Sequence, residues 1–145
     1  MRDIFLLEMI MDKKSLKLVR VFVKNIVEYA GFSAEDTGYI ELALNEVCEN
    51  IVRHGYEENR GFVAVKAELN DEFIIITIID RGREYDISKY KPMKVKKLYE
   101  NEIKGKLGIR MINSICDKVS YKRLKGKNKT VLVKKRKNTP PAAVC

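Results

Sequence analysis

Two apolar segments near the middle of the 145-residue chain, residues 62–69 and 72–79, are separated by only two residues. Both segments are rich in Val, Ile and Phe, the residue types that favour β-strands. The pair between them, Asn70 and Asp71, is typical of a tight hairpin turn. The pattern predicts a β-hairpin at the centre of the fold, and a sheet built on it is expected to be largely antiparallel.

Two helices are expected before this hairpin. Residues 14–29 repeat apolar side chains at the spacing of an amphipathic helix, and Gly31 supplies a C-terminal stop. Ser33 is followed by two acidic residues and predicts the N-cap of a second helix, which runs to about Arg53 and is ended by Gly55.

The other expected elements are a strand at 3–10, a long loop at 81–104, a short helix at 109–116, and strands at 117–124 and 129–136 joined by a turn at 125–128. This order predicts an α+β fold of two layers, with a mixed, mostly antiparallel sheet and the helices on one face. No repeat or linker divides the chain. One domain is therefore expected over residues 1–137, followed by a disordered tail at 138–145.

The charge of the chain is unevenly distributed. Residues 1–88 hold 11 cationic and 17 anionic side chains, a net charge of −6, whereas residues 89–145 hold 18 and 3, a net charge of +15. The basic half is expected to face something anionic, which leaves nucleic acid, an acidic protein, a membrane surface or a small polyphosphate as partners.

The sequence disfavours several protein classes. The longest apolar run, residues 73–79, is far shorter than the ~20 residues of a membrane-spanning helix. Glu8 interrupts what would be the apolar core of a signal peptide. The three cysteines have no Cys-x-x-Cys spacing, which argues against a disulfide framework or a zinc site and fits a reducing compartment. A cytoplasmic protein without a membrane partner is expected.

Glu46 and Asn50 are four residues apart on the second predicted helix, so they lie on the same edge of it. This edge borders the apolar face of the helix, from which a carboxylate and an amide can reach into a half-buried pocket. The alternative is a pair of ordinary solvated helix residues.

Asp80 follows the most apolar predicted strand and is itself followed by Gly82 after one residue. An Asp at the end of a buried strand carries a large desolvation cost unless it receives hydrogen bonds, and an adenine amino group is one suitable donor. Gly82 permits a turn at positive φ or the close approach of a ligand. The alternative is a turn that uses Asp and Gly only as strand breakers.

Gly105 and Gly108 open the short helix predicted after the lysine-rich loop. Backbone N–H groups at a helix start, with Lys104 and Lys106 nearby, form an anion site suited to phosphates. The stretch is not a Walker A loop. The alternative is a simple transition from loop to helix.

The order and spacing of these motifs resemble those of the GHKL ATPase superfamily, which includes the ATP-binding domains of gyrase and of histidine kinases. Within the superfamily, the chain is most similar to the anti-sigma factor serine kinases. The resemblance covers residues 10–136 and is carried by the stretches 46–56 (EVCENIVRHGY), 80–86 (DRGREYD), 105–112 (GKLGIRMI) and 116–121 (CDKVSY). It implies the two-layer α/β sandwich of the Bergerat type.

The resemblance also implies a role for each motif residue. Asn50 would coordinate Mg²⁺ through its amide oxygen, and Glu46 would be the general base. Asp80 would accept a hydrogen bond from the adenine amino group, with Gly82 giving the base room. The remaining implied nucleotide contacts are Lys104, Gly105, Lys106, Leu107 and Gly108 at the phosphates, under a lid at 84–104, and Thr130 at the adenine through water. The implied cofactors are ATP and Mg²⁺.

Two positions depart from the family pattern. Glu84 stands where the second glycine of Asp-x-Gly-x-Gly is common, and Lys106 stands where the phosphate loop commonly has a glycine. Neither departure removes a residue of the implied chemistry, and both leave the affinity for nucleotide open.

The resemblance implies an ATP-dependent serine protein kinase that phosphorylates a small anti-sigma-factor antagonist and sequesters a sigma factor. It also implies a homodimer formed through the first helix and the N-terminal strand. A second hypothesis is a nucleotide-gated protein-binding regulator without kinase activity. A third is a basic nucleic-acid-binding domain, which is disfavoured because the basic half contains no recognised nucleic-acid-binding motif.

Overall fold

The computed structural model describes residues 2–85, 112 and 115–136. The elements in this part of the chain are β1 (Asp3–Asp12), α1 (Leu16–Tyr29), α2 (Ala34–Asn50), the π-helical turn η1 (Ile51–Gly55), β2 (Arg60–Leu69), β3 (Phe73–Asp80), β4 (Lys118–Leu124) and β5 (Lys127–Lys135). Most of the predicted loop at 81–104, most of the predicted helix at 109–116 and the predicted tail at 138–145 lie outside the described residues.

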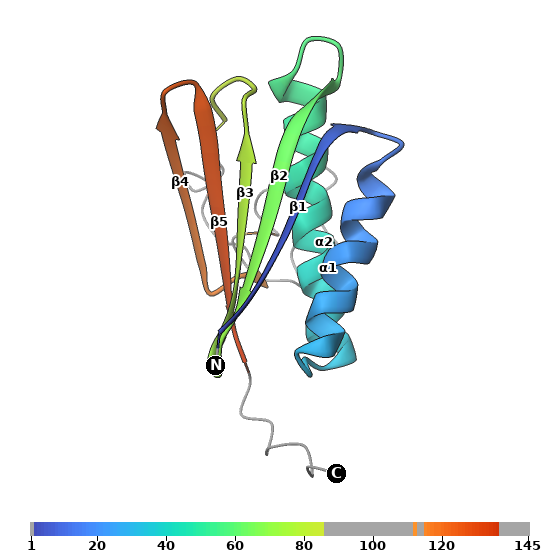
Figure 1. The fold of residues 1–145 in the computed structure, drawn as a ribbon, viewed down its shortest axis with the longest axis vertical. Helices are drawn as coiled ribbons and strands as arrows, with labels where there is room; N and C mark the ends of the chain where they lie inside the picture. The colour runs from blue at the N-terminus through green and yellow to red at the C-terminus, as the bar shows by residue number, and fades with distance from the viewer. Residues whose placement is uncertain (1, 86–111, 113–114, 137–145) are drawn as a thin grey trace, which may run out of the picture.

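The strands form one sheet in the order β1-β2-β3-β5-β4, and each neighbouring pair is antiparallel. Figure 1 shows α1 and α2 side by side along one face of this sheet. Alternate strand residues such as Val63, Val65 and Ala67 are fully buried in the same core cluster as the helix residues. The predicted two-layer α+β fold is confirmed.

The two helices form for the reasons that the sequence indicates. In α1 the buried residues recur at helical spacing and are Leu16, Val19, Val23, Ile26 and Val27. The Ser33 side chain accepts a hydrogen bond from the Asp36 N–H at 3.1 Å, as expected of an N-cap. Within the described residues, neither helix combines the length and the apolar character needed to cross a membrane.

The second helix changes form earlier than its sequence pattern predicts. It is α-helical only to Asn50 and continues through Ile51–Gly55 as a π-helical turn, whereas the pattern predicts an α-helix to about Arg53. The Gly55 carbonyl at its end accepts a hydrogen bond from the Arg83 N–H at 2.9 Å. The end of the helix is therefore tied to the turn after β3, a contact that local sequence cannot reveal.

Both predicted hairpins form, with different turn lengths. The β2–β3 loop has three residues, 70–72, because the Asn70 side chain accepts hydrogen bonds from the N–H groups of Glu72 and Phe73 at 2.8 and 2.7 Å. The β4–β5 turn is shorter than predicted. It consists of Lys125 and Gly126, whose φ angles are 52° and 74°, so β5 begins two residues before the predicted position.

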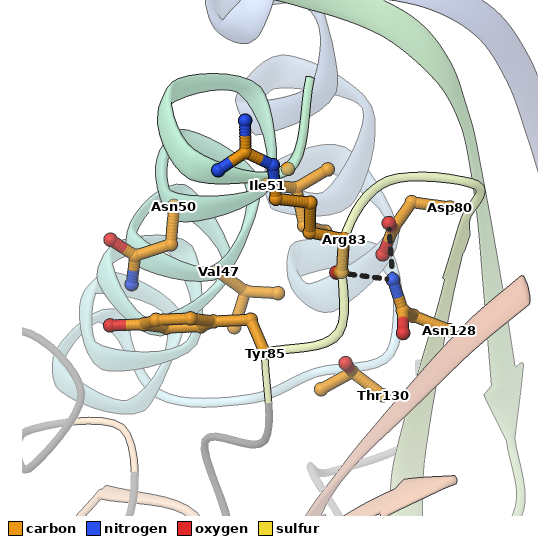
Figure 2. Close-up of a pocket in the computed structure, with 9 residues that line it drawn as sticks. Val47, Asn50, Ile51, Asp80, Arg83, Tyr85, Asn128 and Thr130 are labelled. Carbon is orange, nitrogen blue, oxygen red and sulfur yellow. Dashed lines mark hydrogen bonds between the residues drawn. The ribbon is translucent and has the colours of Figure 1, made fainter. Parts of the chain in front are cut away.

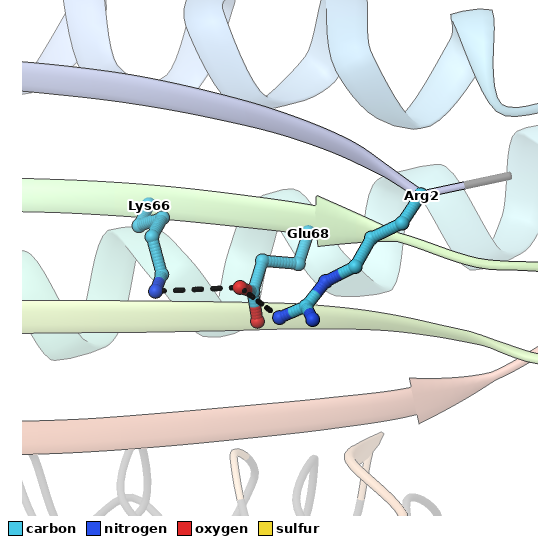
Figure 3. Close-up of polar contacts among 3 residues, drawn as sticks. All are labelled: Arg2, Lys66 and Glu68. Carbon is cyan, nitrogen blue, oxygen red and sulfur yellow. Dashed lines mark hydrogen bonds and ion pairs between the residues drawn. The ribbon is translucent and has the colours of Figure 1, made fainter.

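The face of the sheet opposite the helices carries an ion cluster (Figure 3). Glu68 is only 8% exposed there, with Arg2 Nη2 at 2.6 Å and Lys66 Nζ at 3.3 Å from its Oε1. The hydrogen bond from Arg2 is the main cause that holds the pKa of Glu68 below its usual range. Ile4 and Leu6 of β1 pair with Glu68 and Lys66, and their side chains are 54% and 59% exposed. This face therefore combines charge with exposed apolar surface.

Candidate functional site

A pocket lies between the helix layer and the sheet, beside the turn that follows β3 (Figure 2). The described residues that line it are Val47, Asn50, Ile51, Gly55, Asp80, Arg83, Tyr85, Asn128 and Thr130. Three predicted site residues, Asn50 from α2, Asp80 from β3 and Thr130 from β5, are thus brought together from three elements.

Asp80 is the last residue of β3 and is 2% exposed. Its Oδ1 accepts hydrogen bonds from the Gly82 N–H and from Asn128 Nδ2, both at 2.9 Å. Burial raises the pKa of this carboxyl above its ordinary value, although the two hydrogen bonds and the Arg123 guanidinium oppose the rise. The structure therefore places Asp80 as the sequence predicts, desolvated at the end of a strand and stabilised by donors.

Asn128 ties the turn after β3 to the last hairpin. Besides its bond to Asp80, Nδ2 lies 3.1 Å from the Gly82 carbonyl oxygen and 2.8 Å from that of Arg83. The Asn128 Oδ1 accepts hydrogen bonds from Arg123 Nη1 at 2.8 Å and from the Tyr121 hydroxyl. Arg123 Nη1 also donates to the Gly82 carbonyl oxygen at 2.9 Å.

Gly82 is required by the close approach of two backbone segments. A Cβ atom built on Gly82 would lie 2.7 Å from the Gly55 carbonyl oxygen, a distance that side chains essentially never show. Gly82 is not among the described glycines with positive φ, nor does it line the pocket. The sequence suggests a turn at positive φ or the close approach of a ligand, whereas the group that approaches Gly82 in the structure is the backbone at Gly55.

Asn50 closes α2 and lies in the pocket with 4% of its surface exposed. Within the part of the chain that the structure describes, its Nδ2 has no hydrogen-bond partner. Buried amides in folded proteins are nearly always satisfied. A polar ligand in the pocket would supply the missing hydrogen-bond partner of the Asn50 amide nitrogen.

Glu46 lies one helical turn before Asn50 and is half-buried, but it is not among the described lining residues. Burial is the main cause that raises the pKa of Glu46; the negative charge of Glu49 adds to the rise and Arg53 opposes it. Arg53 and Glu49 form an ion pair one turn along the helix. A carboxylate with a raised pKa is better matched to proton transfer near neutral pH.

Six of the nine described lining residues are not predicted as site residues, and Asn128 and Tyr85 are the two of these whose side chains link separate elements. Tyr85 stacks on His54 with ring centroids 5.8 Å apart and planes 18° apart, so it joins η1 to the segment after β3. For Asn128 a weak signal exists, because Asn is uncommon in strands and lies two residues before Thr130, on the same face. Nothing in the local sequence indicates that its side chain crosses to β3.

The predicted phosphate contacts, Lys104, Gly105, Lys106, Leu107 and Gly108, lie outside the described residues. The predicted lid at 84–104 lies outside them too, apart from its first two residues. The described pocket therefore contains the predicted site residues Asn50, Asp80 and Thr130 without the predicted phosphate contacts.

Comparison with known proteins identifies the protein family to which the chain belongs. The model of the histidine kinase-like ATPase domain family matches residues 9–135. The chain belongs to this family, and the resemblance to the GHKL ATPase superfamily is confirmed.

Within this family, the chain is similar to relatives from the anti-sigma factor kinases. The serine-protein kinase RsbW of Halalkalibacterium halodurans is 30% identical over 122 residues, which cover 80% of this chain and 75% of the relative. The serine-protein kinase RsbW of Bacillus cereus (strain AH187) is 28% identical over 106 residues, covering 70% and 66%. The chain thus spans about two thirds to three quarters of the length of these relatives.

A solved structure supports the fold. The RsbU and RsbW domains of Rv1364c from Mycobacterium tuberculosis superpose with a TM-score of 0.64 at 20% identity. The match covers 93% of this chain and 34% of that chain.

Proposed function

We propose that the protein is an ATP-dependent serine protein kinase that phosphorylates a small anti-sigma-factor antagonist and binds a sigma factor. The observation that carries this proposal is the pocket shared by Asp80 and Asn50, where a buried carboxylate is held by donors and the buried Nδ2 of Asn50 has no hydrogen-bond partner among the described residues. The similarity to serine-protein kinases named RsbW supports the reaction class.

ATP would bind with its adenine against Asp80, whose carboxylate accepts a hydrogen bond from the adenine amino group. Thr130 would contact the base through water, and residues 104–108 would hold the phosphates. Asn50 would hold Mg²⁺, which neutralises negative charge on the triphosphate when bound.

Glu46 would remove the proton from the serine hydroxyl of the antagonist. The serine oxygen then bonds to the γ-phosphorus while the bond from that phosphorus to the β,γ-bridging oxygen breaks, so that phosphoserine and ADP form. The half-buried position of Glu46 and the upward direction of its pKa support this assignment.

The proposal includes a homodimer. Three apolar side chains of β1, Ile4, Leu6 and Ile10, are 54%, 59% and 54% exposed on the sheet face that carries the Glu68 cluster. On α1, Leu18 and Val21 are 60% and 49% exposed. Exposed apolar surface on both elements supports the expected pairing through the N-terminal strand and the first helix.

The proposed function is tested with the full chain, Mg²⁺, labelled ATP and a cognate antagonist, measuring bound ATP and transferred label in the same samples. Wild type should label a serine of the antagonist, Glu46→Ala should bind ATP without transfer, and Asn50→Ala should lose both. Wild type that binds ATP but transfers nothing would contradict the kinase and favour a nucleotide-gated regulator. Nucleic-acid binding with a steep salt dependence and no need for ATP would favour the third hypothesis.

A further inference from the structure

Five hydrogen bonds converge on the Asn128 side chain, and together they fix which way its amide points. The Arg123 guanidinium can only donate, so the Asn128 atom 2.8 Å from it must be the carbonyl oxygen. The amide nitrogen must then face Asp80, Gly82 and Arg83, where it meets only acceptors. Because Asn128 is 2% exposed, no water can easily replace these partners.

This fixed amide also orients the Asp80 carboxylate. Oδ1 receives two N–H donors, from Asn128 and from Gly82, each at 2.9 Å. Both of these described hydrogen bonds end on the same oxygen, so Oδ1 is held as an acceptor and a proton on the carboxyl would have to sit on Oδ2. Oδ2 is therefore the atom whose protonation decides whether Asp80 accepts from a ligand or donates to it.

We propose that Asn128 is a positioning residue that keeps Asp80 an oriented acceptor and thereby makes the pocket prefer a purine with an exocyclic amino group over one with a carbonyl at the same position. This inference rests on the proposed nucleotide-binding function and names the residue that sets its base specificity. Asn128 need not touch the base, because it acts through Asp80 and through the turn at 80–83.

The charges around Asp80 show why it depends on Asn128. Among the described residues, Cys48 from α2, Tyr56 after η1 and Arg123 from β4 interact electrostatically with Asp80, and the cationic Arg83 lines the same pocket. Burial raises the pKa of Cys48 to about 12 and also raises the pKa of Tyr56, so both groups are neutral near pH 7. Arg123 is the only cation of the three, and Asn128 Oδ1 helps to hold it in place.

Loss of Asn128 would remove one donor from Asp80 and one anchor from Arg123. Asp80 would then keep its proton to higher pH, and a protonated Oδ2 donates instead of accepting. A carbonyl-bearing base would gain from this change while an amino-bearing base would lose. The change in specificity, rather than a general loss of binding, distinguishes positioning from a purely structural role.

The test measures dissociation constants of ATP and ITP, which carries a carbonyl in place of the adenine amino group, for the full chain across the neutral pH range. For Asn128→Ala we expect ATP to bind at least ~10-fold more weakly, ITP to change by less than ~3-fold, and the pH midpoint of ATP binding to move upward. Asn70→Ala is the matched control, because Asn70 also caps backbone N–H groups but at the opposite end of β3. It should leave both constants unchanged.

If Asn128→Ala does not fold, a measurement on the wild-type protein carries the test. In the wild type, the Asn128 side-chain N–H signals in NMR spectra should shift on ATP binding while those of Asn70 do not. A folded Asn128 variant with the wild-type ratio of ATP to ITP affinity would overturn the inference while leaving the proposed function intact. Asn128 side-chain signals whose chemical shifts do not change when ATP binds would do the same. Wild type that binds no ATP would overturn both.

Discussion

The burial of Asp80 affects the free energy of unfolding as well as the proposed binding of ATP. It is almost fully buried, and burial raises its pKa above the ordinary value of 3.8. The folded chain therefore holds the carboxyl proton more tightly than the unfolded chain does. The free energy of unfolding must fall as pH rises from the unfolded pKa through the raised folded pKa, and it stays lower above that window.

Asp80→Asn removes this titration while keeping an oxygen that accepts from Gly82 and Asn128. We expect the free energy of unfolding at neutral pH to equal or exceed that of wild type, with a weaker dependence on acidic pH. ATP affinity should fall by ~10–100-fold, since a hydrogen bond to a charged group contributes ~1.5–3 kcal/mol. Urea unfolding at acidic and neutral pH and ATP titration measure the two effects. A variant that loses stability at neutral pH yet binds ATP normally would contradict this interpretation.

The residues that the sequence can predict are those whose chemistry is visible locally. Asp80 after an apolar strand and Asn50 on the edge of a helix signal desolvated polar groups from their neighbours in the chain alone. Asn128 and Tyr85 cannot be predicted in this way, because their roles depend on contacts with β3 and η1 that are distant in sequence. At Gly82 the sequence suggests room for a ligand, but the Gly55 backbone that approaches this glycine is visible only in three dimensions.

At the level of elements, the junction between η1 and the turn after β3 sets the pocket. The Gly55 carbonyl accepts from the Arg83 N–H, and the Gly82 α-carbon packs on the same backbone. π-Helical turns are rare and frequently lie at functional sites, which is consistent with η1 forming one wall of the pocket. Helix and strand periodicity predicts the surrounding elements, since those patterns are local, whereas the π-helical turn is held by a tertiary hydrogen bond.

This junction makes a prediction that contrasts two glycines. Gly82→Ala should destabilise the fold by ~1–3 kcal/mol and weaken ATP binding, because its methyl group would meet the rigid Gly55 backbone at 2.7 Å. Gly38→Ala, in the interior of α2 with open space around its Cβ, should instead stabilise by ~0.5–1 kcal/mol and leave ATP binding unchanged. Chemical denaturation and ATP titration of both variants test the pair. Equal behaviour of the two would show that the close contact is unimportant.

At the scale of the whole molecule, a group of arginine side chains lies beside the pocket. An open groove next to it is lined by Gly55, Tyr56, Glu57, Glu58, Arg60, Arg81, Gly82, Arg83 and Arg123. None of the four arginines forms an ion pair with a carboxylate among the described residues. Arg123 is anchored by the Gly82 carbonyl oxygen, and Arg81 lies over the Phe62 ring at 4.5 Å. Only Arg123 of this groove comes from the basic half of the sequence, whereas Arg60, Arg81 and Arg83 belong to the half with a net negative charge. The chain's membership of an ATPase family accounts for part of the anion preference that the charge of the basic half left open.

We expect this groove to contact acidic side chains of a protein partner. Added salt should then weaken partner binding more than ATP binding, because exposed charges are screened more than a buried site is. Arg81→Glu should lower the affinity for the antagonist or the sigma factor by ~10-fold or more. Lys127→Glu makes the same charge change at the tip of the β4–β5 hairpin, outside the groove, and should have little effect. Titrations of ATP and of the partner at low and high salt measure these affinities for wild type and both variants. An equal loss of partner affinity in the two variants would exclude the groove as the contact surface.

We propose that this chain transfers the γ-phosphoryl group of ATP to a protein serine with Glu46 as the base. The most direct measurement is a single-turnover reaction with the antagonist in which phosphoserine and bound ATP are followed together for wild type, Glu46→Gln and Glu49→Gln. We expect phosphoserine to form with wild type and Glu49→Gln, and to form ~10²–10⁴-fold more slowly with Glu46→Gln while ATP still binds. Wild type that is saturated with ATP and forms no phosphoserine, or Glu46→Gln that reacts at the wild-type rate, would contradict it.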